Sequence, residues 1–186
     1  LNALGTRAYV ASRGTNSIWV IDTVRNAVLA EVPAGLEPLG AALNPAGTHL
    51  YFTNKNSLSV LDVATNKLAK SIFVGNDPYG VAVNTTGTRV YVAASGSNQI
   101  AVVDPTGPTI LKVIATGSGS GPIGVALDHP RNRLYVANSA NGMVTVIDTD
   151  TNAIVKNIPA GAGINGVAVN STGTRVYAAD GAGRVA

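Results

Sequence analysis

The sequence predicts an all-β fold of the β-propeller type, built from four-stranded blades of about 42 residues. The first observation is a polar turn, opened by Asn or Asp, that recurs at intervals of 42, 40, 44 and 42 residues. These turns begin at Asn2, Asn44, Asn84, Asp128 and Asn170. The second observation is that short apolar runs with β-branched and aromatic residues lie between the turns, as is typical of strands. A repeat of this length made of strands without helices indicates propeller blades.

The composition agrees with strands that are mostly buried. Of the 186 residues, 46% are hydrophobic and only 12% are charged, which is about half the usual charged share. The net charge of +3 is weak evidence for nucleic-acid binding. Because the chain has no cysteine, disulfides, thiolate metal sites and cysteine nucleophiles are excluded. No apolar run reaches the roughly 18 residues of a membrane span.

We divide the chain into a single array of repeat units. The units are roughly 1–38, 39–78, 79–122 and 123–164, with a partial unit at 165–186. Each unit after the first begins with an inner strand whose first residue is glycine. We attribute this glycine to close backbone approach near the ring axis, where a side chain has no room. The predicted inner strands are 40–43, 80–83, 124–127 and 166–169.

The other three strands of each unit also have fixed features. The second strand carries a tyrosine at one constant place, namely Tyr9, Tyr51, Tyr91, Tyr135 and Tyr177. The third strand ends in an aspartate that we expect to close a turn through its side chain. These aspartates are Asp22, Asp62, Asp104 and Asp148. The predicted fourth strands are 27–32, 68–74, 110–115 and 154–158.

Three strings resemble YVTN-type β-propeller repeats: Ser-Ile-Trp-Val-Ile-Asp-Thr (17–23), Asn-Asp-Pro-Tyr-Gly-Val-Ala-Val-Asn (76–84) and Thr-Arg-Val-Tyr-Val (88–92). The resemblance covers essentially the whole chain. It implies a surface-layer or other exported prokaryotic protein, and therefore an extracellular, cell-surface or periplasmic location. The blades are also similar to those of lactonase-like and cytochrome-associated propellers. This scaffold hosts many activities, so the resemblance identifies the fold and not one function.

The number of repeats predicts an incomplete ring. Family propellers close with about seven blades, whereas this chain holds about four and a half repeats, and we interpret it as a piece of a longer array. One alternative is that the strand at 166–169 completes the first unit in cis and closes a four-bladed ring. The other is that the partial blades of two chains complement each other in a nine-bladed dimer. Because unpaired strand edges are adhesive, we expect a homo-oligomer.

The loops at the predicted channel mouth suggest a metal site. Two acids precede inner strands at places where other units have Gly121 and Gly163. Further carboxylate and amide side chains follow the second strands. The predicted ligands are Glu37, Asp77, Asn54, Asn138 and Asp180. Such oxygens suit a hard cation such as Ca²⁺, and the lactonase-like resemblance implies a metal that polarises a carbonyl or activates water. Solvated acids at loop tips are the alternative.

Trp19 breaks the repeat in a different way. Its equivalents Ser59, Ala101 and Thr145 are all small. A large aromatic residue at such a place predicts a position on the blade surface and an interface with a partner or a second copy of the chain. Packing in the core is the alternative.

Other motifs point away from catalysis and cofactors. The G-x-G-x-x-G string at 161–166 precedes a strand and not a helix, so we predict no dinucleotide site. His49 and His129 are interpreted as surface residues, and no catalytic triad is identified. A ring of arginines is interpreted as solvated, since no aromatic residues are interleaved for base stacking. These arginines are Arg7, Arg89, Arg133 and Arg175.

Two functional hypotheses follow. The first is a non-enzymatic binding or scaffold module of an exported or cell-surface propeller, whose loops at the channel mouth contact a protein or a glycan. The second is a metal-dependent hydrolase acting on a lactone, ester or phosphoester at the same mouth. No catalytic residue is assigned in either.

Overall fold

The computed structural model describes residues 1–181, which form antiparallel sheets and almost no helix. The first sheet is β1 (Arg7–Ser12), β2 (Ser17–Asp22) and β3 (Ala27–Pro33). The second is β4 (Ala41–Leu43), β5 (His49–Asn54), β6 (Ser57–Asp62) and β7 (Lys67–Phe73). The third is β8 (Pro78–Val83), β9 (Val90–Ala94), β10 (Gln99–Asp104) and β11 (Thr109–Ala115). The fourth is β12 (Pro122–Asp128), β13 (Arg133–Asn138), β14 (Met143–Asp148) and β15 (Ala153–Pro159), with the 3₁₀ helix η1 (His129–Arg131) between β12 and β13. The last is β16 (Ile164–Val169) and β17 (Val176–Asp180).

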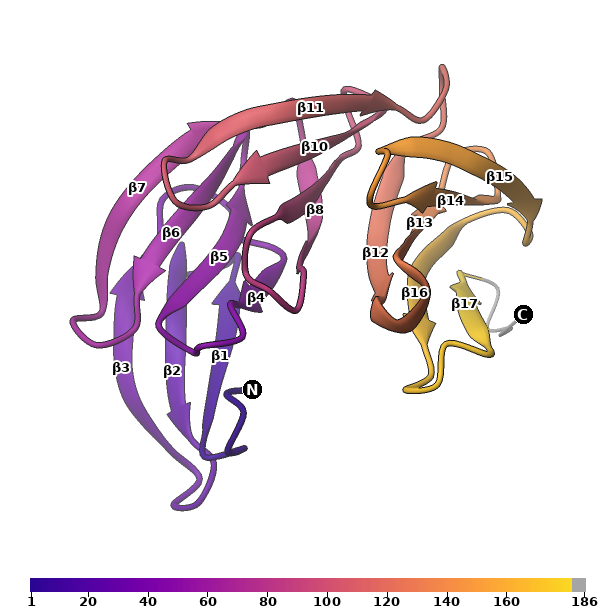
Figure 1. The fold of residues 1–186 in the computed structure, drawn as a ribbon. Coiled ribbons are helices and arrows are strands. Elements are labelled where there is room, and N and C mark those ends of the chain that lie inside the picture. The colour runs from indigo at the N-terminus through magenta and orange to yellow at the C-terminus, as the bar shows by residue number, and fades with distance from the viewer. Residues whose placement is uncertain (182–186) are drawn as a thin grey trace.

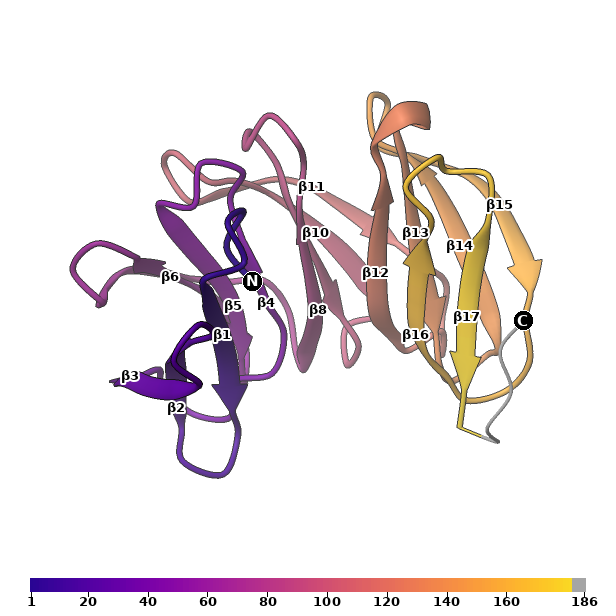
Figure 2. The ribbon, with the colours of Figure 1, turned by 90° about the horizontal axis from the view of Figure 1, so that it is seen from below.

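The sheets stand side by side in chain order, as the propeller prediction requires. Within each sheet the strands also follow chain order, and every pair is antiparallel. The inner strands β4, β8, β12 and β16 contact one another in sequence. Figures 1 and 2 show the β1–β3 sheet at one end of this row and the β16–β17 sheet at the other. The all-β propeller prediction is therefore confirmed. No helix within residues 1–181 is long and apolar enough to cross a membrane.

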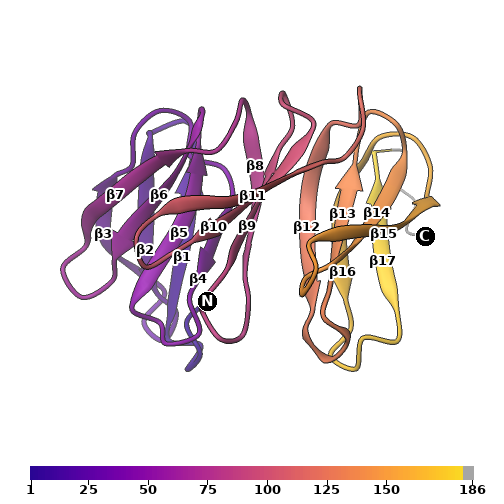
Figure 3. The same cartoon turned by 45° about the horizontal axis from the view of Figure 1, so that its top comes forward.

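Closure of a four-bladed ring in cis is wrong for this structure. The strand predicted to complete the first unit, β16, pairs with β17 and contacts β12 and β13. It is therefore held at the far end of the row, as Figure 3 also shows. Within the described part of the chain, β1 pairs with β2 alone and keeps a free edge.

The glycines predicted to open the inner strands do not open them, because β8, β12 and β16 begin two residues earlier and β4 begins one residue later. Three of these glycines nevertheless lie where backbones meet. A Cβ at Gly124 would come within 2.8 Å of the carbonyl oxygen of Asn165 in β16. Gly40 and Gly80 approach Tyr79 and Ile123 of the following sheets even more closely. The prediction of close backbone approach is therefore confirmed at these three junctions.

The apolar core lies between neighbouring sheets. Leu58 and Val60 of β6 pack toward Val90 and Val92 of β9 in the next sheet. Because side chains alternate along a strand, the other face of the second sheet packs toward the first one. There, the buried cluster contains Ile18, Val20, Val32, Leu50 and Phe52. Each complete sheet thus has one face toward the preceding sheet and one toward the following sheet.

Candidate functional site

The loops before the inner strands place Glu37 and Asp77 in a left-handed backbone conformation. Their φ angles are 54° and 48°. Gly121 and Gly163 hold the same place with φ angles of 57° and 73°. Glycine adopts this conformation without steric cost, whereas in a residue with a Cβ the side chain crowds the backbone and raises the energy. The two acids that break the repeat therefore sit at backbone positions that favour glycine.

The carboxylates of these two acids lie beside residues of nearby hairpin loops. Glu37 forms an ion pair with Arg13 at 2.8 Å between exposed side chains. The Glu37 amide donates to Asn16 Oδ1 at 2.9 Å. The carboxylate of Asp77 lies over Gly96, where an added Cβ would be 2.6 Å from Asp77 Oδ2. Each acid thus interacts with a hairpin loop of a sheet beside it.

Asn54 and Asn138, which end the second strands, are buried and tie loops to strands. Asn54 Nδ2 donates to the Ala34 carbonyl at 2.9 Å, and its Oδ1 accepts from Ser57. Asn138 Nδ2 donates to Thr145 Oγ1 at 2.7 Å. The buried Asn138 Oδ1 has no hydrogen-bond partner within residues 1–181. Asp180 ends β17 and lies opposite Ile164 in the ladder.

The predicted ligands do not form a cluster of acids. Within residues 1–181, no group of three or more His, Cys, Asp or Glu side chains is arranged to hold a metal ion. Glu37 and Asp77 come from loops of successive units, and the two asparagines use their amide groups in structural hydrogen bonds. Calcium at these residues and metal-dependent hydrolysis stay predictions.

The aspartates that end the third strands close turns, as predicted. Asp62 Oδ1 accepts from the Thr65 amide at 2.8 Å, and Asp148 Oδ1 accepts from the Thr151 amide at 2.9 Å. The pKa of each carboxyl lies below its ordinary value, chiefly because hydrogen bonds from the following turn stabilise the charged form. The carboxyls are those of Asp22, Asp62, Asp104 and Asp148.

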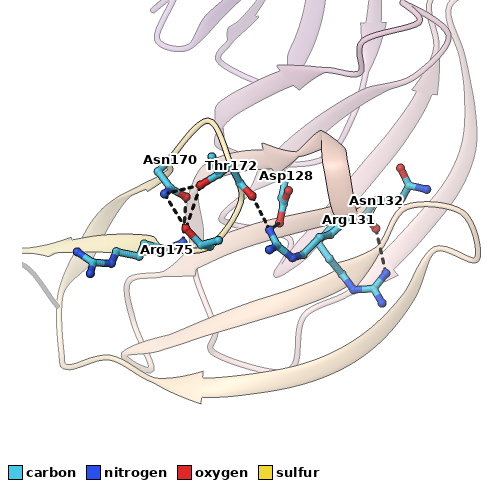
Figure 4. A network of polar contacts seen from close by, with 8 residues as sticks. Asp128, Arg131, Asn132, Asn170, Thr172 and Arg175 are labelled. Carbon is cyan, nitrogen blue, oxygen red and sulfur yellow. Dashed lines mark hydrogen bonds and ion pairs between the residues drawn. The ribbon is translucent and has the colours of Figure 1, made fainter.

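Asp128 is a buried carboxylate that sequence reasoning missed. It is 1% exposed, and its Oδ2 lies 3.4 Å from Nη1 of Arg131. Arg131 Nη1 also donates to the Thr172 carbonyl at 2.9 Å, so this contact joins the fourth sheet to the fifth (Figure 4). The signal in the sequence was the Asp at a turn position that other units fill with Asn.

Trp19 lies on the face of the first sheet that points away from the second. Its register partners are Val10 and Glu31, and Nε1 donates to Ser17 Oγ at 2.9 Å. The equivalent residues in the complete sheets are fully or almost fully buried, namely Ser59, Ala101 and Thr145. Trp19 itself is only half-buried. In the complete sheets this position is covered by the preceding sheet, and no sheet within residues 1–181 covers Trp19 in that way.

The comparisons with known proteins agree on the fold. The β-propeller domain of Cps50 (Swd1) from Myceliophteria thermophila has a TM-score of 0.84 at 13% identity, over 97% of this chain and 61% of that one. A functionally unknown protein from Desulfotomaculum acetoxidans has a TM-score of 0.81 at 16% identity, over 94% and 59%. The dihydro-heme d1 dehydrogenase NirN in complex with DHE has a TM-score of 0.77 at 17% identity, over 97% and 40%.

These similarities establish the β-propeller fold alone, because all three identities are below 20%. The chain spans between 40% and 61% of the length of these three structures. No protein-family model matches the sequence. No curated protein matches it.

Proposed function

We propose that this protein is a non-enzymatic binding module of an exported or cell-surface β-propeller, and that a second copy of the chain covers the free face of its first sheet. The observation that carries the proposal is the position of Trp19. In the complete sheets, the face equivalent to the Trp19 face is an inter-sheet contact.

The character of this face supports a protein contact. Trp19 lies beside Val10, and Ile21 lies beside Val28 in the strand register. Val10 is 45% exposed and Val28 is 53% exposed. Contiguous apolar side chains at the end of a sheet are typical of interaction surfaces. A second copy is the occupant we favour, because the interfaces between neighbouring sheets of this chain already join apolar faces of this kind.

The free edge of β1 adds a second source of attraction. Among residues 1–181, the edge of β1 that faces away from β2 has no partner strand. Unpaired backbone groups on such an edge favour addition of a strand from another chain. The loops at the channel mouth, with Glu37 and Asp77, would remain outside this contact and available to a protein or glycan partner.

The test is the mass of the particle in solution. Native mass spectrometry and light scattering over a concentration series are expected to give a dimer for the unmodified chain and a monomer for Trp19→Ser. Phe73→Ser is the matched control, because Phe73 is 62% exposed on a different sheet. A monomer for the unmodified chain at every concentration would overturn the proposed contact, as would a Trp19→Ser dimer of unchanged strength.

A further inference from the structure

A polar cavity lies between the third and fourth sheets, among the repeat turns. Its volume is about 330 Å³, at the lower end of the range for small-molecule sites. One wall comes from the turn 84–88, and the other comes from 128–132 and from Thr149 and Asp150 of the adjoining hairpin. The buried Tyr91 also lines the cavity.

The two walls differ although they are copies of one repeat. Asn84 Oδ1 caps its own turn by accepting from the amides of Thr88 and Arg89, both at 2.9 Å. Asp128 holds the same repeat position but makes no side-chain cap. Helix η1 follows instead and ends at Arg131, and the next residue, Asn132, is left-handed with a φ of 52°. Residues of two chemically different turns therefore line the cavity.

The walls carry both hydrogen-bond donors and acceptors. Arg89 donates through Nη1 to the Thr88 carbonyl at 2.8 Å, which leaves the rest of its guanidinium available. The Thr85 hydroxyl makes no hydrogen bond to any residue between 1 and 181. On the other wall, Asn132 Nδ2 donates to Asp150 Oδ2 at 2.9 Å. Asn132 Oδ1 and Asp150 Oδ1 are then left as acceptors.

Asp128 lines the cavity, but its carboxylate lies against the fifth sheet. The residue is 1% exposed, yet its Oδ1 has no hydrogen-bond partner in the described chain. A buried acceptor without a donor is unfavourable. A Cβ at Gly173 would overlap this oxygen, so the deficit belongs to the junction of the fourth and fifth sheets and not to the cavity.

The balance of charge selects the chemical class of the ligand. Asp128 is paired with Arg131, and at the cavity Arg89 stands against the carboxylate of Asp150, so a phosphate or other anion meets repulsion as well as attraction. The lining is too polar for an apolar compound. We propose that this cavity binds one sugar unit of a neutral carbohydrate, whose hydroxyl groups both donate and accept. The proposal does not rest on the contact at Trp19, which lies on a different sheet.

The experiment is a binding titration with defined probes. The intact chain is mixed with glucose, galactose, mannose or N-acetylglucosamine, with neutral oligosaccharides of these sugars, and with inorganic phosphate. Saturation-transfer NMR and calorimetry measure binding. We expect at least one neutral sugar or oligosaccharide to bind. Binding of an oligosaccharide without its free monosaccharide supports the proposal and indicates a glycan chain as the natural ligand. Binding of both also supports the proposal that the cavity holds one sugar unit.

The repeat provides matched variants for the same titration. Thr85→Ala and Arg89→Ala remove groups of the cavity, whereas Ser171→Ala and Arg175→Ala change the equivalent residues of the fifth unit. Each cavity variant is expected to weaken sugar binding roughly tenfold, and each control is expected to leave it unchanged. The proposal is overturned by the absence of binding to every sugar, by binding of phosphate alone, or by equal losses in cavity and control variants.

Discussion

Gly80 lies so close to Ile123 of the next sheet that a Cβ at Gly80 would overlap the Ile123 carbonyl oxygen. The inner strands of neighbouring sheets thus meet backbone to backbone. Gly166 holds the same repeat position in β16, but its nearest neighbour for an added Cβ is Ala179 Cβ at 4.0 Å. One repeat position therefore has two different environments, because no further sheet follows β16 and β17 in the described chain.

This difference predicts opposite responses to the same substitution. Gly80→Ala should lower the free energy of unfolding by about 1–3 kcal/mol, since carbonyl and side chain cannot share the space. Gly166→Ala should be neutral or slightly stabilising, because alanine restricts the unfolded chain without a clash. Urea unfolding followed by far-UV circular dichroism measures both. Equal destabilisation by the two variants would contradict close packing as the reason for these glycines.

Glu37→Gly is expected to stabilise the protein. The left-handed backbone at Glu37 costs about 1 kcal/mol for a residue with a Cβ, and the exposed pair with Arg13 contributes little in return. Glu37→Ala is the control, because it removes the ion pair and keeps the strained backbone. Thermal unfolding should therefore rank Glu37→Gly above the unmodified chain and Glu37→Ala at or below it. A gain in Glu37→Ala as large as in Glu37→Gly would exclude the backbone explanation.

Asp148 predicts a loss of stability in acid. Its pKa is below the ordinary value because the Thr151 amide and hydroxyl, the Asp150 amide and Arg133 favour the charged form. Its contribution is therefore fully present above the unfolded pKa of about 3.9 and is lost as pH falls through the lower folded pKa. Asp148→Asn keeps the turn geometry but cannot titrate. The denaturant midpoint of this variant should fall less between pH 5 and pH 2 than that of the unmodified chain, and parallel curves would refute the assignment.

The Asp128–Arg131 contact should behave as a coupled pair. Arg131→Ala leaves the buried Asp128 carboxylate without its ion-pair partner and should cost about 1–3 kcal/mol. Adding Asp128→Asn removes the buried charge and restores the residue found in the other turns, so it should recover part of that loss. A double-mutant cycle in urea gives the coupling energy between the two residues. Additive effects would show that the carboxylate does not depend on Arg131.

The predicted ligands illustrate the limit of reasoning by repeat comparison. Glu37 and Asp77 were identified because they replace glycine, and the structure adds that the glycine belongs to a left-handed backbone. The sequence does not contain that dihedral angle. Asn54 and Asn138 were predicted as oxygen ligands, and the structure adds that both are buried and that their Nδ2 groups hold loops and strands, while Asn138 Oδ1 has no partner in the described chain. The alternation of side chains along one strand shows which face a polar group lies on. It does not show which strand packs against that face, and burial depends on that neighbour.

The sequence by itself determined the repeat, the four strands of each complete unit, the turn aspartates and the glycines of close approach, because these depend on local backbone geometry and periodicity. The tertiary structure decided which face of each sheet meets a neighbour. That decision buries Ser59 and leaves Trp19 only partly buried, and it places the unpartnered oxygen of Asp128 against Gly173 of the fifth sheet. Equivalent residues of a repeat share their backbone but not their neighbours, so only the packed arrangement of sheets separates a structural position from a candidate site.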